Sequence, residues 1–344
     1  MLAQTTVCDI FEGERKWMEF CYVGKNIWAI DIAAKTTEMY KQDESDKWER
    51  IYWKNQDFGG LGSLLMHTHE ISVVNNLIYI SILRRTAQSR CRLFEFDTET
   101  LIWRQVADIW ASTLLNSLVL NNKMYQYINP RQMTIKCLDT EQIAYVNFPP
   151  IENLRREFNE IININGLIYT ISLTWDGTRI VFMYNDQAGE MIEISRTTDP
   201  ELGIRGNRTP SAYMRENLWS CNNRIYHALV FYYHQAVRID CYDIQTDQWS
   251  IVCCAEFFGR GVRSIFGTEK EIHVMYSGTD CVKHQIIDLR PTLEHLALTQ
   301  LIDNTESDDY DNVVNRVPAS LRDHFKYLYE WRQKVLRCGP VQRL

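Results

Sequence analysis

Two short pairs of histidines and cysteines are the residues in this sequence whose types come closest to metal or redox chemistry. His67 and His69 stand two positions apart, so a strand would present both imidazoles on one face, as metal ligands require. A third or fourth ligand at a suitable spacing is missing, which favours ordinary surface histidines. Cys253 and Cys254 are adjacent inside the apolar run Ile251–Ala255, which indicates a strand core. The sequence therefore predicts no metal site and no cofactor.

Catalytic motifs are also missing from the sequence. It contains no glycine-rich phosphate loop, no G-x-S-x-G and no H-E-x-x-H. Asp97, Asp243 and Asp288 follow apolar strands where the chain must turn, so they are predicted to be turn residues. We therefore expect that the chain is not an enzyme. The alternative, an enzyme with a central pocket, predicts several ionisable groups with perturbed pKa values meeting in that pocket.

Composition and charge exclude several classes of protein. The 344 residues include 44 acidic and 37 basic side chains, a net charge of −7, which argues against a dedicated nucleic-acid binder. No run of eighteen apolar residues predicts a membrane span, and the N-terminus does not resemble a signal peptide. Ten cysteines without regular spacing predict reduced thiols in a cytoplasmic or nuclear protein.

A repeated unit predicts the architecture that positions these residues. Each copy has a polar turn followed by an apolar strand, as in Asn75–Tyr79 and Asn222–Tyr226. The copies carry an aromatic residue or histidine at Trp28, Tyr79, Tyr125, Tyr169, Tyr226 and His273. With the strand before each turn and two strands after it, each unit holds four strands, which is typical of a propeller blade.

A second signature recurs later in each unit, where an Asp precedes an aromatic residue by six positions. Asp97 precedes Trp103, Asp243 precedes Trp249, and Asp139 precedes Tyr145. The Asp can satisfy backbone groups of the turn, and the aromatic side chain is expected to pack between neighbouring sheets.

These signatures together predict an all-β fold, a six-bladed propeller over residues 1–290. The last blade has no outer strand of its own, so we expect Thr6–Phe11 to supply it and close the ring.

The units resemble Kelch repeats through Asn-Asn/Gly-x-Ile-Tyr and Tyr/Phe-Asp-x-x-Thr-x-x-Trp. They depart from that family because Tyr79 is followed by Ile80–Arg84 in place of a Gly-Gly pair. In Kelch-like propellers the loops between inner strands line one face, and Arg and aromatic side chains there are favoured anchors for a partner. The substrate-binding candidates are Arg84, Arg85, Arg90, Arg131, Trp175 and His234. An arginine cluster would suit an acidic or C-terminal carboxylate motif; the alternative is a set of solvated loop charges.

The segment 291–344 has a different period. Leu293, Leu296, Ala297 and Leu301 fall on one helical face, and Pro318–Asp323 is typical of a second helix start. Thr292–Leu301 resembles the elongin-binding first helix of a SOCS box, with Ala297 in place of that family's Cys.

The following segment, Val317–Phe325, resembles the part of a SOCS box that docks a cullin. Val317 stands there for Leu and Ser320 for the second Pro. The resemblance implies elongin contacts through Thr292, Leu293, Leu296, Ala297 and Leu301. It implies cullin contacts through Val317, Pro318, Leu321 and Phe325.

A propeller followed by a SOCS-box-like helical tail implies a substrate-recognition adaptor of an elongin–cullin RING ubiquitin ligase. Its partners would be elongin B, elongin C, a cullin with its RING partner, and an unknown protein substrate, with no nucleic acid and no membrane. The alternative is a cytoskeletal or signalling scaffold whose C-terminal helices cap the propeller. Burial of Leu293, Leu296 and Leu301 against the blades would favour the cap, and exposure would favour the adaptor.

Overall fold

The computed structural model describes most of the strand-forming sequence and part of the C-terminal segment. The described residues are 4–12, 18–32, 37–42, 47–54, 67–84, 90–110, 117–129, 131–140, 142–154, 160–199, 202, 214–231, 235–257, 261–268, 270–277, 281–289, 301, 310–318, 322, 325–326 and 329. No helix among them is long and apolar enough to cross a membrane.

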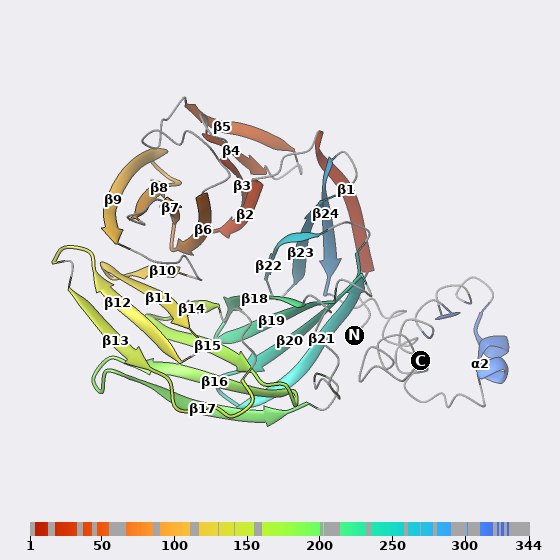
Figure 1. The fold of residues 1–344 in the computed structure, drawn as a ribbon. Helices are drawn as coiled ribbons and strands as arrows, with labels where there is room; N and C mark the ends of the chain where they lie inside the picture. Colours follow the sequence, from red (N-terminus) through yellow and green to blue (C-terminus); the bar gives the residue numbers. More distant parts are fainter. Residues whose placement is uncertain are drawn as a thin grey trace.

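Six four-stranded antiparallel sheets form a ring, which confirms the predicted six-bladed propeller (Figure 1). Blade 1 contains β2 (Met18–Val23), β3 (Asn26–Ile32), β4 (Thr37–Gln42) and β5 (Trp48–Lys54), and blade 2 contains β6 (His67–Val74), β7 (Leu77–Arg84), β8 (Arg90–Asp97) and β9 (Ile102–Trp110). Blade 3 contains β10 (Ser117–Leu120), β11 (Lys123–Asn129), β12 (Gln132–Cys137) and β13 (Ile143–Asn147), and blade 4 contains β14 (Ile161–Ile164), β15 (Leu167–Leu173), β16 (Thr178–Asn185) and β17 (Glu190–Thr198). Blade 5 contains β18 (Met214–Cys221), β19 (Arg224–Phe231), β20 (Ala236–Asp243) and β21 (Gln248–Glu256). The first strands of the blades, β2, β6, β10, β14, β18 and the β22 of blade 6, surround the centre.

Blade 6 is completed from the other end of the chain. It contains β22 (Val262–Gly267), β23 (Glu271–Ser277) and β24 (Cys281–Asp288), and its outer strand is β1 (Gln4–Glu12). β1 pairs antiparallel with β24, from Gln4 opposite Asp288 to Glu12 opposite Cys281. The predicted closure of the ring by the N-terminal strand is confirmed, and it covers the edge of β24 that would otherwise be open.

The two ends of the ring differ in the connections that they carry. The turns between first and second strands and between third and fourth strands lie at one end, which we call the turn end. The connections between second and third strands and from blade to blade lie at the other, the loop end. In the turns between first and second strands, asparagine or glycine occupies the left-handed positions, because it tolerates positive φ in tight hairpins. These positions are Gly24, Asn75, Asn121, Asn122, Asn165, Gly166, Asn222 and Asn223.

The Asp-to-aromatic signature acts as predicted in two blades and differently in a third. The Asp97 carboxylate accepts hydrogen bonds from the backbone N–H groups of Glu99 (2.9 Å) and Thr100 (3.2 Å), and Trp103 packs on Phe96 with ring centroids 4.9 Å apart. Asp243 accepts from its turn in the same way, and Trp249 packs on the ring of Tyr242.

The prediction that Tyr145 packs between sheets is wrong, because its side chain is 62% exposed. Cys137, and not Asp139, occupies the strand position of Asp97 and Asp243, because Cys137 pairs with Lys123 as Asp97 pairs with Leu77. Asp139 lies two residues later, in the turn, so Tyr145 lies two residues further along its strand than Trp103 and pairs with Thr134. Because side chains alternate along a strand, the next residue, Val146, occupies the buried position.

Charged side chains connect blades 4 and 5. Arg179 of β16 donates to Asp240 of β20 (2.6 Å), and Arg238 of β20 donates to Asp240 (2.9 Å) and to Asp199 after β17 (2.5 Å). Burial lowers the pKa of Arg179. For Arg238, burial also acts to lower the pKa, but the charge of Asp240 acts in the opposite direction and the pKa is raised overall. The Arg179 guanidinium lies 4.1 Å from the ring centre of Trp249.

Aromatic packing dominates the boundary between blades 6 and 1. Tyr22 of β2 stacks against Phe266 and His273, each with ring centroids 6.4 Å apart. His273 and His284 are buried side by side, with Nδ1 of the first 2.9 Å from Nε2 of the second. Burial first, and then His273, lowers the pKa of His284 to about 3.

Candidate functional site

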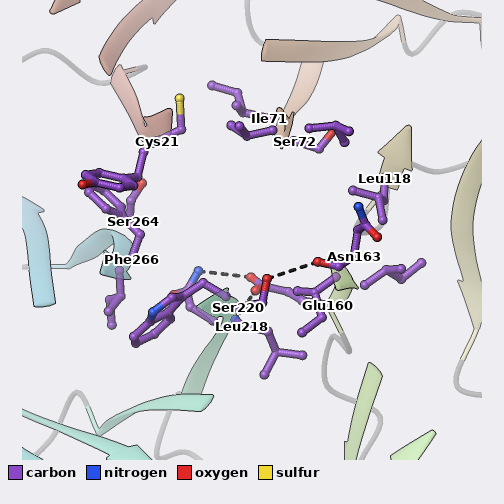
Figure 2. A pocket seen from close by; sticks show the side chains of 18 of the residues that line it. Cys21, Ile71, Ser72, Leu118, Glu160, Asn163, Leu218, Ser220, Ser264 and Phe266 are labelled. Carbon is purple, nitrogen blue, oxygen red and sulfur yellow. Dashed lines mark hydrogen bonds between the residues drawn. The ribbon is translucent and has the colours of Figure 1, made fainter. Parts of the chain in front are cut away.

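A central cavity of about 660 Å³ lies where the first strands of all six blades meet (Figure 2). This volume falls in the range of small-ligand pockets. Each blade contributes a short stretch of its first strand, so the cavity exists only because the ring closes. It is the best-defined concave site among the described residues, and we treat it as the candidate functional site.

Glu160 of blade 4 is fixed on the wall of this cavity by donors from blade 5. Its carboxylate accepts a hydrogen bond from the Leu218 backbone N–H and another from Nδ2 of Asn217 (3.1 Å). Its backbone carbonyl accepts a hydrogen bond from the hydroxyl of Thr170 (2.8 Å). The residue lies directly before β14, at the loop end of the cavity.

Glu19 of blade 1 lies at the opposite side of the ring. The Ser264 hydroxyl from blade 6 donates to the Glu19 carboxylate (3.4 Å) and accepts from the Phe20 backbone N–H (3.3 Å). Blades 1 and 4 are three positions apart in a ring of six, so the two carboxylates line the cavity from opposing walls. Both are partly exposed.

Apolar side chains, hydroxyl groups and the amides of Asn75, Asn163 and Asn217 make up the remaining wall. Figure 2 shows the apolar residues Cys21, Ile71, Leu118, Leu218 and Phe266 around the cavity, together with the hydroxyls of Ser72, Ser220 and Ser264. The Cys21 thiol is buried, and burial raises its pKa, so it acts as a small apolar group. A cavity with walls of mixed polarity and two carboxylates from opposed blades can hold a small group by its shape and by its charge.

The fold brings the four described substrate-binding candidates to the loop end, because each lies at a connection between the second and third strand of its blade. Arg84 ends β7, Arg90 begins β8, and Arg131 precedes β12 with an exposed side chain. Trp175, half-buried, lies between β15 and β16. Arg85, His234 and the side chains of Arg84 and Arg90 lie outside the described residues, so one continuous patch stays a prediction.

The C-terminal segment has a small core of its own. The described helix α2 (Tyr310–Arg316) contributes Tyr310, Val313 and Val314 to a cluster with Val317, Phe325 and Tyr329. Figure 1 draws α2 outside the ring of blades. The predicted pair of helices is not shown, because α2 is the one helix whose two ends both lie in the described part of this segment.

The predicted docking residues of the tail divide into three groups. Val317 and Phe325 are buried in the tail's own cluster, 2% and 0% exposed, so their side chains stabilise that cluster. Pro318 is exposed, and Leu301 is 38% exposed. Thr292, Leu293, Leu296, Ala297 and Leu321 lie outside the described residues.

The histidine pair and the cysteine pair that were considered for metal or redox chemistry lie on strands. His67 and His69 are in β6, opposite Arg84 and Ile82 of β7, and their side chains are outside the described set. Cys253 and Cys254 are buried in β21, as predicted for a strand core. Across the described ranges, no group of three or more His, Cys, Asp or Glu side chains has an arrangement that could bind a metal ion.

Comparison with known proteins finds similar structures but no match to a family model or a curated protein sequence. One of the solved structures that it resembles is the GH43 BlXynB protein from Bacillus licheniformis, at 12% identity and a TM-score of 0.42. The match covers 72% of this chain and 56% of that protein, so the chain spans about half of its length. These values carry no inference about the activity of this chain.

The prediction that the chain is not an enzyme is corrected, because missing motifs do not exclude catalysis on a propeller fold. That prediction depended on missing motifs, and the matched structure is a GH43 glycoside hydrolase with a propeller fold.

Glu19 and Glu160 escaped the sequence analysis because no local motif connects them. They come together through ring closure, from strands far apart in the sequence. The available signal was the presence of polar residues in or beside the otherwise apolar first strands of the blades. Residues of this kind are Glu19, Ser72, Ser117, Glu160, Asn217 and Ser264.

Proposed function

We propose that this chain is a substrate-recognition adaptor of an elongin–cullin RING ubiquitin ligase. In this proposal residues 1–290 form a divergent Kelch-like propeller that binds a protein substrate at its loop end. Residues 291–344 form a SOCS-box-like tail that binds elongin C, in complex with elongin B, and a cullin with its RING partner, in the cytoplasm or nucleus. The propeller fold itself supports an interaction scaffold.

The observation that carries the proposal is the tail's separate core together with its exposed leucine. The cluster around Phe325 is made from residues of the tail, and no blade residue belongs to it among those described. Leu301, a predicted elongin contact, is 38% exposed, which favours docking on a partner over packing on the blades. The order of the motifs, Thr292–Leu301 and then Val317–Phe325, supports the same assignment.

The burial of Val317 and Phe325 narrows the set of residues that could contact a cullin directly. Both side chains would shape the tail, and the exposed Pro318 would make the direct contact. Leu293 would be the main anchor in the elongin C groove, in the helix-in-groove mode of recognition.

Co-expression with elongin B and elongin C tests the proposal. The wild-type chain should co-purify as a stoichiometric complex, and Leu293→Asp should reduce recovery at least about tenfold, because burial of this leucine in the elongin C groove would contribute ~1.5–3 kcal/mol that a charged side chain loses. Ile102→Asp is the matched control: Ile102 is 62% exposed on the outer strand β9, so the variant should co-purify like wild type. Equal recovery of Leu293→Asp and wild type, or no complex at all, would contradict the adaptor role.

A further inference from the structure

The central cavity has a charge of one sign along its described lining. Glu19 and Glu160 are among its lining residues, and none of the described lining residues is Lys, Arg or His. Donors from the neighbouring blade hold each carboxylate in place: Ser264 for Glu19, and Asn217 and Leu218 for Glu160. A concave site lined by one sign of charge between low-dielectric walls concentrates counter-ions of the opposite sign.

The walls between the two carboxylates combine apolar side chains with hydroxyl and amide groups, so they can contact a short stem as well as its polar head. Ile71, Leu118, Leu218 and Phe266 come from four different blades and surround the space that Glu19 and Glu160 border. A volume of about 660 Å³ accommodates an aliphatic stem with a charged head and some water. Long cationic side chains combine these features, an apolar stem and a charged tip.

We infer that the central cavity binds a protonated amine or guanidinium carried on an aliphatic stem. Glu160 and Glu19 accept hydrogen bonds from the cationic head, and the apolar walls contact the stem. The same chemistry occurs in a free polyamine and in a Lys or Arg side chain of a polypeptide that enters from the loop end. The inference depends on the cavity alone, so binding of elongin by the tail does not decide it.

Calorimetric titration of the full chain with three matched five-carbon ligands tests the inference. The ligands are 1,5-diaminopentane, 1,5-pentanediol and glutarate, which share a chain length and differ in the charge of their ends. The diamine should bind at least about tenfold tighter than the diol, since hydrogen bonds to charged groups are worth ~1.5–3 kcal/mol. Glutarate should not bind, and added salt should weaken binding of the diamine.

Two glutamate variants and one control assign the binding to the cavity. Glu160→Gln and Glu19→Gln should each weaken diamine binding about tenfold or more, because each keeps the shape of the side chain and removes its charge. Glu190→Gln makes the same charge change at an exposed position on the outer strand β17 and should bind like wild type. Thermal melts establish that each variant folds; if Glu160→Gln does not, Glu19→Gln and the salt dependence of wild type still decide.

The inference fails if the diol or glutarate binds as tightly as the diamine, if both cavity variants bind like wild type, or if millimolar diamine gives no signal. A further titration identifies the source of the cation. Tighter binding of acetyl-Gly-Lys-Gly-amide than of the diamine would indicate a polypeptide ligand, and the reverse order would indicate a free polyamine.

Discussion

The boundary between blades 4 and 5 and the boundary between blades 6 and 1 connect equivalent sheets by different chemistry. The first uses reciprocal ion pairs, Arg179 with Asp240 and Arg238 with Asp199, all from side chains at most 15% exposed. The second uses stacked rings around the buried His273 and His284, which lie in the sheet that the N-terminal strand completes. The propeller geometry therefore requires only that neighbouring blades pack. The residues at each boundary determine whether ion pairs or aromatic contacts join the two blades.

Removal of one charge at the blade 4–5 boundary should have the largest effect. Asp240 is 0% exposed and accepts from both arginines, so Asp240→Asn leaves two buried guanidinium groups with one charge partner fewer. We expect the free energy of unfolding in urea to fall by ~3–5 kcal/mol. Glu193→Gln breaks the exposed pair with Arg196 and should cost less than ~1 kcal/mol. Similar losses in the two variants would show that burial does not strengthen the ion pairs.

The second largest effect should be a loss of stability in acid that originates at the blade 6–1 boundary, where His284 is buried. The His284 pKa is lowered from 6.5 to about 3, so between these values the unfolded chain binds a proton that the folded chain does not. Stability is therefore complete above pH 6.5 and falls as the pH decreases, with a slope approaching ~1.4 kcal/mol per pH unit. Glu271, 3.4 Å from His273, acts in the opposite direction on the pKa of His284.

Urea unfolding at pH 7.5, 6.5 and 5.5 measures this slope. His284→Asn keeps a hydrogen-bonding side chain beside His273 and removes the titration, so its stability should fall less steeply than that of wild type over this range. Equal slopes would mean that folding does not change the protonation of His284 over this pH range.

The sequence predicted the parts of the fold that depend on local chemistry. Asparagines such as Asn75 and Asn122 specify the hairpin turns because they tolerate positive φ, and Asp97 and Asp243 bond to their own turns. The blade count and the closing strand followed from counting these units. The position of Tyr145 did not, because Asp139 lies two residues beyond the strand position of Asp97 and Asp243, so Tyr145 is offset from the position of Trp103 and Trp249.

The parts that depend on ring closure escaped sequence reasoning. One ion-pair network connects blades 4 and 5 through Arg179, Asp199, Arg238 and Asp240. No spacing of these residues in the sequence predicts it. Glu19 and Glu160 line the same cavity from opposed blades for the same reason. In contrast, the placement of Arg84, Arg90, Arg131 and Trp175 at the loop end was accessible, since it needs only the strand order within each blade.

The smallest effect should come from a single hydrogen bond at the blade 6–1 boundary. Ser264→Ala removes the acceptor of the buried Phe20 N–H and should cost ~0.5–1.5 kcal/mol in urea unfolding. Ser220→Ala removes the exposed hydroxyl that donates to the Asn163 carbonyl between blades 4 and 5, and should cost less than ~0.5 kcal/mol. Apolar packing of Phe20, Phe266 and Met275 persists in Ser264→Ala, so the blades should stay joined. A loss as large as that of Asp240→Asn would mean that hydrogen bonding, and not this packing, holds the boundary together.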